Sequence, residues 1–388
     1  MSEVLGQLVP TVLILGALIF VHELGHFVAC RFSGVAVEKF SIGFGPELIT
    51  WQWKGTRYSL SLIPFGGFVK PKGETQEDIG AERQPEPGDF LFASKGQRFA
   101  ILIAGVVMNF AFAYVLFVLV MLMGRPILAP TIGGFVEGYP AQTSGLMAGD
   151  QVTHLNGNPV SNWKDLAFAI LESKSSVLEF MVVREGRSRV IEVMPEFEEG
   201  RDIFGQQRQV PRIGIKPADH VMTERFGIQE ALVKAAQYEW RLSALTFEAL
   251  WRLVTGQLSL RAISGPIGII AMAGTAAKAG AVALIQFTAI LSVSLAVINL
   301  LPIPALDGGH LLFLGLEVIR GRQISISLQE RVTRIGFYFL LALMAVVVYN
   351  DLVTVNAFEK LKSIGTRAAD LVYSQIEGRL SRSIKPAR

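Results

Sequence analysis

Apolar and polar residues alternate along the chain in blocks, and four of the blocks are apolar. These apolar runs cover residues 5–30, 99–124, 279–306 and 335–350. A helix rises about 1.5 Å per residue, so roughly 20 residues cross a hydrocarbon core of about 30 Å. The pattern therefore predicts four transmembrane helices, and the shortest run is long enough if its flanking side chains snorkel to the interface.

Between the first two apolar runs, the pattern changes to strands and turns. Residues 47–53 and 57–63 alternate in polarity around a Lys54-Gly55 turn, which predicts a β-hairpin. Residues 64–70, which include Gly66 and Gly67, are expected to form a flexible apolar loop. An exposed strand edge beside the first span would accept an extended peptide by strand addition, and a purely structural hairpin explains the pattern equally well.

Residues 127–195 have the pattern of a soluble α+β domain, with short strands, an Asn156-Gly157 turn and one amphipathic helix. Residues 196–216 are polar and are expected to be poor in strands. Residues 226–262 predict an amphipathic helix along the membrane surface, ended by a Gly265-Pro-Ile-Gly268 break. The predicted parts of the chain are residues 1–126, 127–195, 196–278, 279–350 and a partly helical tail, 351–388.

Composition agrees with a membrane protein. Of 388 residues, 51% are hydrophobic and 18% are charged, with a mean hydropathy of +0.43, whereas soluble domains carry about 25% charged residues. The net charge of +3 gives no reason to expect nucleic acid as a partner, and the single cysteine excludes an internal disulfide. No Lys or Arg precedes the first apolar run, which we expect to be a retained span and not a signal peptide.

The first apolar run contains the motif His22-Glu-Leu-Gly-His26. Residues four apart share one helix face, so His22 and His26 can bind one zinc ion, and Glu23 is placed to deprotonate a water at the metal. Ionisable residues inside a membrane are costly and usually functional. Histidines satisfied by ordinary helix contacts are the structural alternative.

A catalytic zinc needs a third protein ligand. The best candidate is Asp307 in Asn299-Leu-Leu-Pro-Ile-Pro-Ala-Leu-Asp307-Gly-Gly-His310, where prolines interrupt the third apolar run. Irregular backbone at membrane depth is tolerated when it is buried in protein or lines a cavity. His310 and Cys30 are rival ligands, whereas His154 and His220 are expected at the surface of the soluble domain. Asn299 could hydrogen-bond substrate or a developing oxyanion.

These stretches resemble the site-2 protease family of intramembrane zinc metalloproteases, in particular its bacterial regulator of sigma-E protease type. The stretches that carry the resemblance are the His22–His26 motif, Ile63-Pro-Phe-Gly-Gly-Phe-Val-Lys70, Ala104-Gly-Val-Val-Met-Asn-Phe110, Gly265–Gly268 and Asn299–Gly309. The resemblance implies that His22, His26 and Asp307 bind zinc, that Glu23 is the general base, and that Gly66 and Gly67 belong to a re-entrant β element that guides substrate. Val106 departs from the family, which usually has proline there.

The soluble part resembles a PDZ domain of the bacterial protease type, so the expected fold is a polytopic α-helical membrane protein with a membrane-associated β-hairpin and one inserted PDZ-like domain. Some relatives carry a tandem pair of such domains. The loop Gly138-Tyr139-Pro140-Ala141 corresponds to the place where these domains receive a peptide carboxylate in backbone amides. The sequence leaves open whether this copy binds peptides or only blocks access. Asn109 is expected either to contact substrate or to form an interhelical hydrogen bond.

The resemblance implies regulated intramembrane proteolysis of single-span membrane proteins, such as anti-sigma factors or remnant signal peptides, after a first cut by a site-1 protease. Lys and Arg near the span ends place loops 31–98 and 319–334 in the cytosol of a bacterium. The PDZ-like domain and both termini are then outside the inner membrane, although basic residues in the tail argue the other way. A scaffold with a structural metal and an ion transporter are the alternatives, and neither needs Glu23 beside its ligands.

Overall fold

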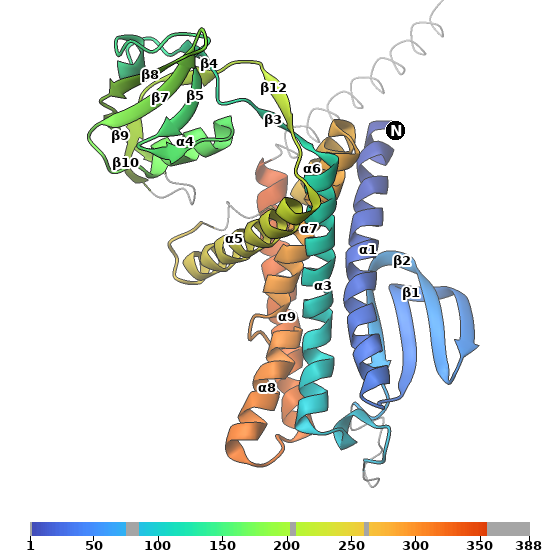
Figure 1. Cartoon of the computed structure of the whole chain (residues 1–388). Coiled ribbons are helices and arrows are strands. Elements are labelled where there is room, and N and C mark those ends of the chain that lie inside the picture. The colour runs from blue at the N-terminus through green and yellow to red at the C-terminus, as the bar shows by residue number, and fades with distance from the viewer. Residues whose placement is uncertain (1, 75–84, 202–206, 260–263, 355–388) are drawn as a thin grey trace, which may run out of the picture.

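The computed structural model describes residues 2–74, 85–201, 207–259 and 264–354. Within these residues, four helices are long and apolar enough to cross a membrane. They are α1 (Ser2–Phe32), α3 (Lys95–Met123), α7 (Ala281–Asn299) and α9 (Ile326–Thr354). They stand roughly parallel to one another (Figure 1) and correspond to the four predicted apolar runs.

Local sequence sets both ends of α3. The Ser94 hydroxyl accepts a hydrogen bond from the Gln97 amide at 3.3 Å, and the Gln97 side-chain oxygen accepts one from the Ser94 amide at 2.9 Å. This capping box satisfies two backbone donors that a helix start leaves without a helical partner. At the other end, Gly124 has a φ of 86°, which glycine adopts without strain. The helix therefore begins four residues before the predicted start.

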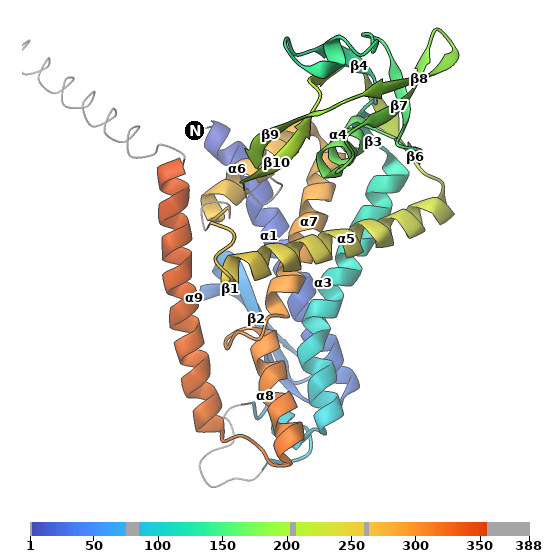
Figure 2. The same cartoon turned by 90° about the vertical axis from the view of Figure 1, so that its left-hand side faces the viewer.

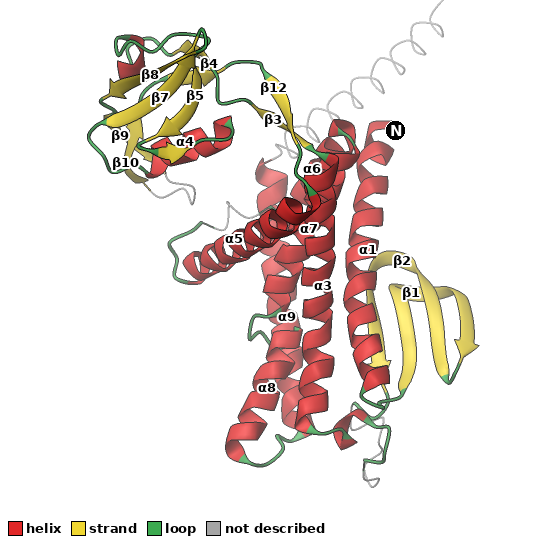
Figure 3. Ribbon diagram, in the orientation of Figure 1, coloured by secondary structure: helices red, strands yellow, loops and turns green. Residues whose placement is uncertain are grey.

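The predicted hairpin is a larger sheet than expected. β1 (Val37–Trp53) and β2 (Thr56–Pro71) are both bent, and Phe40 in β1 lies opposite Tyr58 and Val69 in β2. The strand segments therefore lie in the order 67–71, 37–42, 56–61 and 47–53, beside α1 (Figure 3). The prediction of a loop at residues 64–70 is wrong, because pairing with β1 keeps this glycine-containing segment extended.

A separate α+β domain follows α3. Its main sheet has the order β6-β5-β7-β8, and α4 contributes Leu166 and Ile170 to the core between helix and sheet. The elements of this part are β3 (Arg125–Leu128), β4 (Ile132–Phe135), η2 (Pro140–Gln142), β5 (Gln151–Leu155), β6 (Asn158–Pro159), α4 (Trp163–Glu172), β7 (Leu178–Arg184) and β8 (Arg187–Val193).

The domain continues beyond residue 195. The region predicted to be poor in strands contains β9 (Glu196–Arg201), β10 (Gln207–Arg212) and β11 (Ile215–Pro217). β9 pairs with β10, and β11 pairs with β4. The prediction failed because β9 and β10 are rich in charged residues and show little apolar alternation. β12 (Val221–Glu224) then pairs with β3, and these two strands form the connection to the helices.

Two further helices lie between the domain and α7. α5 (Ile228–Val254) leans across α3 and α7 (Figure 2), and its Ala235 packs with Phe117 and Val293 of these helices. α6 (Pro266–Ala279) begins inside the Gly265–Gly268 motif, and Asp351 of α9 accepts hydrogen bonds from its first amides. The predicted end of the amphipathic helix, at residue 262, lies outside the described residues.

The third span is interrupted. α7 stops at Asn299, residues 300–306 are irregular, and α8 (Asp307–Arg320) starts a new helix. A buried ion pair between Arg98 and Glu317, at 3.0 Å, ties α8 to α3. Preceding α3 is the short helix η1 (Phe90–Phe92).

The start of α1, the α+β domain and the end of α9 all lie at one end of the bundle (Figure 2). This arrangement is what an even number of spans requires. Of the predicted tail, 351–388, the first four residues belong to α9 and the rest lies outside the described residues. Residues 75–84 are likewise not described.

Candidate metal centre

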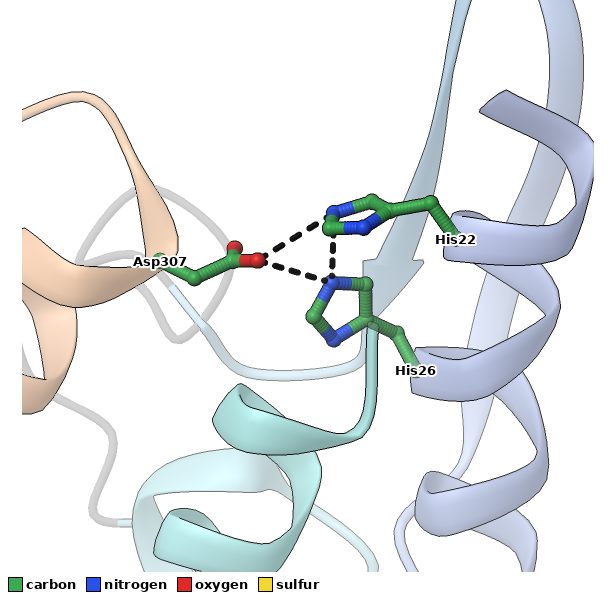
Figure 4. A group of neighbouring side chains, drawn as sticks. All are labelled: His22, His26 and Asp307. Atoms are coloured by element: carbon green, nitrogen blue, oxygen red, sulfur yellow. Dashed lines mark hydrogen bonds and ion pairs between the residues drawn. The ribbon is translucent and has the colours of Figure 1, made fainter. Parts of the chain in front are cut away.

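α1 places two imidazoles side by side. His22 and His26 are one helical turn apart, and their Nε2 atoms lie 3.2 Å from each other. The ring of His22 is buried, with 8% of the residue exposed. Both rings point away from the helix toward the irregular segment before α8 (Figure 4).

Asp307 meets the two rings from the start of α8. Its Oδ2 atom lies 3.1 Å from His22 Nε2 and 3.5 Å from His26 Nε2. The three ligand atoms lie within 4.8 Å of one another, and Oδ2 is buried without a hydrogen-bond partner in the described part of the chain. A buried carboxylate oxygen facing two imidazole nitrogens is costly unless a cation joins them. This donor set fits zinc with three protein ligands and an open position.

Tight backbone packing presents Asp307 to the histidines. A Cβ on Gly308 would lie 2.1 Å from the Leu301 carbonyl oxygen, and one on Gly309 would lie 2.4 Å from that of Ile303. Only glycine therefore lets residues 300–306 fold back against the first turn of α8. Ala305 has a φ of 94°, a strained conformation that costs about 1–3 kcal/mol. Such strain is typical of segments that hold functional groups.

α3 supports both rings from behind. His26 donates its Nδ1 hydrogen to the Ile101 carbonyl oxygen at 2.8 Å, which leaves Nε2 free for a metal. A Cβ on Gly105 would lie 2.4 Å from His26 Nε2 and 2.7 Å from His22 Cε1. The absence of a side chain at Gly105 thus allows α3 to approach the rings, and Gly25 on α1 meets α3 equally closely.

The β-sheet holds the carboxylate of Glu23. Oε2 of Glu23 accepts a hydrogen bond from the Val69 amide of β2 at 2.9 Å. A Cβ on Gly67 would lie 2.8 Å from the Ser41 carbonyl oxygen and 3.5 Å from Glu23 Cγ. Gly67 therefore lets β2 lie close to α1, and the strand holds the Glu23 carboxylate beside His22, His26 and Asp307.

A cavity of about 270 Å³ opens onto this group. Its lining includes His22, Glu23 and Asp307 together with three of the residues predicted to contact substrate, Gly66, Gly67 and Asn299.

The fourth predicted substrate contact, Asn109, is placed elsewhere. Its side chain is fully buried, it does not line the cavity, and its Nδ2 lies 3.2 Å from His22 Nδ1. The interpretation of Asn109 as a substrate contact is therefore corrected, since a residue with no exposed surface cannot touch substrate.

The rival ligands lie apart from the donor group. Among the described residues, the group consists of His22, His26 and Asp307 and includes neither His310 nor Cys30. Cys30 is buried in an apolar cluster with Val35, Val37, Phe90 and Ile101.

The loop predicted to receive a peptide carboxylate has no free amide. Gly138 donates to the Gln142 side chain, Tyr139 to the Val136 carbonyl and Ala141 to the Ile213 carbonyl, while Pro140 has no amide hydrogen. This prediction is wrong because the domain uses these donors internally. Tyr139 does line a cavity of about 370 Å³ between α4 and residues 210–215.

Three supporting groups were missed by sequence reasoning. The Val69 amide and the Ile101 carbonyl belong to the backbone, so no residue type marks them. Gly105 lies in the Ala104–Phe110 stretch of the family resemblance, and its contact with the rings is visible only when α1 and α3 are placed together. A glycine between the two histidines, Gly25, was the available signal that another backbone passes close by.

Apolar helices that enclose a His-His-Asp set, with a carboxylate beside the first histidine, define a metallopeptidase built into a membrane protein. Comparison with known proteins agrees. The model of Peptidase family M50 matches residues 10–343. A relative from Rhizobium meliloti (strain 1021) is 33% identical over 360 residues, which cover 89% of this chain and 96% of the relative.

Two named relatives are similar over most of their length. Zinc metalloprotease RasP of Geobacillus kaustophilus is 30% identical, and the match covers 91% of this chain and 99% of the relative. Regulator of sigma-W protease RasP of Bacillus subtilis is 31% identical, and the match covers 89% of this chain and 98% of the relative. The chain therefore belongs to peptidase family M50 and is a zinc metalloprotease.

Among solved structures, the PDZ domain of the SdrC-like protein from Listeria monocytogenes matches 23% of this chain and 86% of its own, with 20% identity and a TM-score of 0.19.

Proposed function

We propose that this protein hydrolyses peptide bonds inside the transmembrane segments of single-span membrane proteins. In this proposal His22, His26 and Asp307 bind the zinc ion and Glu23 is the general base. The observation that carries the proposal is the convergence of three ligand atoms within 4.8 Å, between helices long and apolar enough to span a membrane.

Bound zinc would polarise the scissile carbonyl and activate the attacking water. Glu23 accepts a proton from that water and later passes it to the leaving amine. The hydrogen bond from Val69 holds this carboxylate toward the cavity, so the base needs little reorganisation before it acts. Asn299, which lines the same cavity, is suited to donate a hydrogen bond to the oxyanion.

The edge of β2 is suited to guide the substrate. A helical substrate hides its carbonyls in hydrogen bonds, so it must unwind before cleavage. The segment at residues 67–71 is an edge of the sheet and lies next to Glu23. An unwound substrate segment can pair with this edge, which exchanges helical hydrogen bonds for strand hydrogen bonds. Gly66 and Gly67 let this segment pack closely against Phe44 and α1.

We further propose that the protein lies in the inner membrane of a bacterium, with the α+β domain and both termini outside the cytosol. The domain lies at the end of the bundle where α1 starts (Figure 1). Because the loop at residues 138–141 has no free amides, the domain acts by excluding bulky extracytoplasmic parts of substrates and not by binding their carboxylates there. A site-1 protease would therefore cut first, and anti-sigma factors and remnant signal peptides are suitable substrate classes.

The test uses purified full-length protein and two variants. His22→Ala is expected to lose the one zinc ion per chain that the wild type holds. Glu23→Gln is expected to keep zinc but to lower cleavage of a single-span substrate with a short extracytoplasmic stub by at least about a thousandfold. The same substrate with an intact folded extracytoplasmic domain should resist the wild type. Continued cleavage by Glu23→Gln would contradict the assignment of the base.

A further inference from the structure

Asn109 on α3 is buried directly behind the first metal-ligand histidine. None of its surface is exposed, and its side-chain amide nitrogen lies 3.2 Å from His22 Nδ1. Its Oδ1 atom is also buried and has no hydrogen-bond partner in the described part of the chain. A buried amide with an unpaired oxygen is costly, so its orientation and purpose require an explanation.

As metal ligands, both histidines need their ring hydrogen on Nδ1. Their Nε2 atoms converge on Asp307, so binding a metal there needs the lone pair of each Nε2 and leaves the ring hydrogen on Nδ1. His26 meets this requirement, because its Nδ1 lies 2.8 Å from the Ile101 carbonyl oxygen and can only donate to it. At His22 the corresponding neighbour is the side chain of Asn109.

An amide nitrogen cannot serve His22 in this way. If Nδ2 of Asn109 donated to Nδ1, the ring hydrogen would have to sit on Nε2, which would then be unable to bind a metal. Half a turn of the amide group brings Oδ1 to the imidazole in place of Nδ2, and Oδ1 then accepts the Nδ1 hydrogen. The turn pairs Oδ1 and leaves Nδ2 where Oδ1 was, so the number of hydrogen bonds is unchanged. What favours this orientation is that it gives His22 the tautomer that a metal ligand needs.

Neighbouring contacts fix Asn109 in this place. Its backbone carbonyl accepts a hydrogen bond from Ser292 of α7 at 2.8 Å, and Ser292 is itself fully buried. One turn earlier, Gly105 lies against the same imidazoles. α1, α3 and α7 therefore meet at Asn109, and its side chain faces His22.

We propose that Asn109 is a positioning residue whose side-chain carbonyl holds His22 as the Nδ1–H tautomer, with Nε2 directed at the metal. This inference depends on the proposed function, because it assumes that His22 is a metal ligand. It gives the membrane-buried site a side-chain partner for one histidine and a backbone partner for the other.

The test compares two variants by metal binding and not by turnover. Asn109→Leu keeps a similar volume but has no acceptor, and it should bind zinc about 10–100 times more weakly in competition with a chelator. Asn109→Asp offers an acceptor oxygen in either orientation and should stay within a few-fold of the wild type. The visible spectrum of cobalt(II) bound in place of zinc should change in the leucine variant and persist in the aspartate variant.

Wild-type zinc affinity in Asn109→Leu would overturn the proposal, and so would equal losses in both variants, because equal losses indicate a purely structural role. A measurement on the unmodified protein covers the case in which the variants do not fold. Nitrogen NMR of the zinc-loaded wild type should show the His22 Nδ1 hydrogen held in a hydrogen bond, and an Nδ1 hydrogen without a hydrogen bond would refute the proposal. If wild type held no zinc or His22→Ala retained it, the proposed function would fail instead.

Discussion

Gly105 determines how closely α3 approaches the two imidazoles. A Cβ there would lie within 3 Å of atoms in both His22 and His26, so Gly105→Ala must push either the rings or the helix aside. We expect zinc affinity to fall at least about tenfold, since displaced ligands bind metal poorly. Zinc content after dialysis against a chelator measures this loss.

The matched control is Gly16→Ala on α1, where no atom lies within 4 Å of the added Cβ. This variant should keep zinc and cleavage, and its helix should gain about 0.5–1 kcal/mol of stability. Full zinc occupancy in Gly105→Ala would show that the rings have more room than the structure gives them.

The ligand set could be predicted from sequence because side chains carry its chemistry. His22, Glu23 and His26 have a spacing that only a helix makes useful, and Asp307 is an acid at the end of an apolar run. The partners of these residues could not be predicted in the same way. Val69 and Ile101 act through the backbone, and Asn109 shows its role only when α3 is placed against α1.

α9 is anchored to α6 by one carboxylate. Asp351 accepts hydrogen bonds from the amides of Gly265, Ile267 and Gly268 at 2.9, 3.0 and 3.0 Å. These donors begin a helix and have no helical partner. Asp351→Ala leaves the amides of buried Gly265 and of half-buried Ile267 and Gly268 without this acceptor, and we expect the free energy of unfolding to fall by about 1–3 kcal/mol. Thermal denaturation in detergent measures the change.

Asp351→Asn keeps one acceptor oxygen and should lose less stability than Asp351→Ala. Glu330→Ala, at an exposed position on the same helix, should leave the denaturation midpoint unchanged. A similar midpoint for Asp351→Ala and Glu330→Ala would mean that water or another group satisfies the three amides.

A buried ion pair stabilises the α+β domain. Both carboxylate oxygens of Asp150 lie 2.7 Å from Arg184, and Oδ2 also accepts the Met147 amide at 2.9 Å. Burial alone would raise the pKa of Asp150, but these hydrogen bonds hold the pKa below its ordinary value. The stability that the pair supplies is therefore complete above about pH 4, the unfolded value, and is lost as the pH falls through the lower folded value.

Arg184→Met should accelerate hydrogen exchange of the β5 and β7 amides at neutral pH and should remove part of the acid sensitivity of the wild type. Arg212→Met is the control, because Arg212 pairs with Glu198 at an exposed site where 55% and 39% of the side chains are accessible. Exposed pairs contribute little. Equal exchange rates in both variants would show that the buried pair adds nothing to the domain.

The four long helices could be predicted because an uncharged run of sufficient length leaves few alternatives to a span. The strands were harder to predict. Residues 64–70 contain a proline and two glycines, which favour a loop, yet pairing of Gly67 with Ile42 and of Val69 with Phe40 makes them a strand. α8 was missed because the prolines before Asp307 interrupt the helical pattern and hide the new start.

The arrangement of the whole molecule gives a testable orientation. The α+β domain and the connection between α8 and α9 lie at opposite ends of the bundle (Figure 2). Ser161 belongs to the domain, Gln323 belongs to the connection, and both are exposed. In spheroplasts, whose inner membrane is intact, Ser161→Cys should react with a membrane-impermeant maleimide. Gln323→Cys should react only after lysis.

The wild type supplies the background for this labelling, because its single cysteine, Cys30, is fully buried. Labelling of Gln323→Cys from outside would reverse the proposed orientation, and it would place the α+β domain in the cytosol.

The hydrogen bond between Val69 and Glu23 joins a strand edge to the carboxylate that we propose as the general base. A compound shaped like an extended strand could exploit both at once. Such a compound would pair with the backbone of β2 and donate a hydrogen bond to Glu23. The Glu23 carboxylate would then be unable to accept a proton from water, although the compound does not touch the metal. Inhibitors of this design would owe their selectivity to the sheet, and they would avoid the zinc chelation that makes hydroxamate-like compounds act on unrelated metalloenzymes.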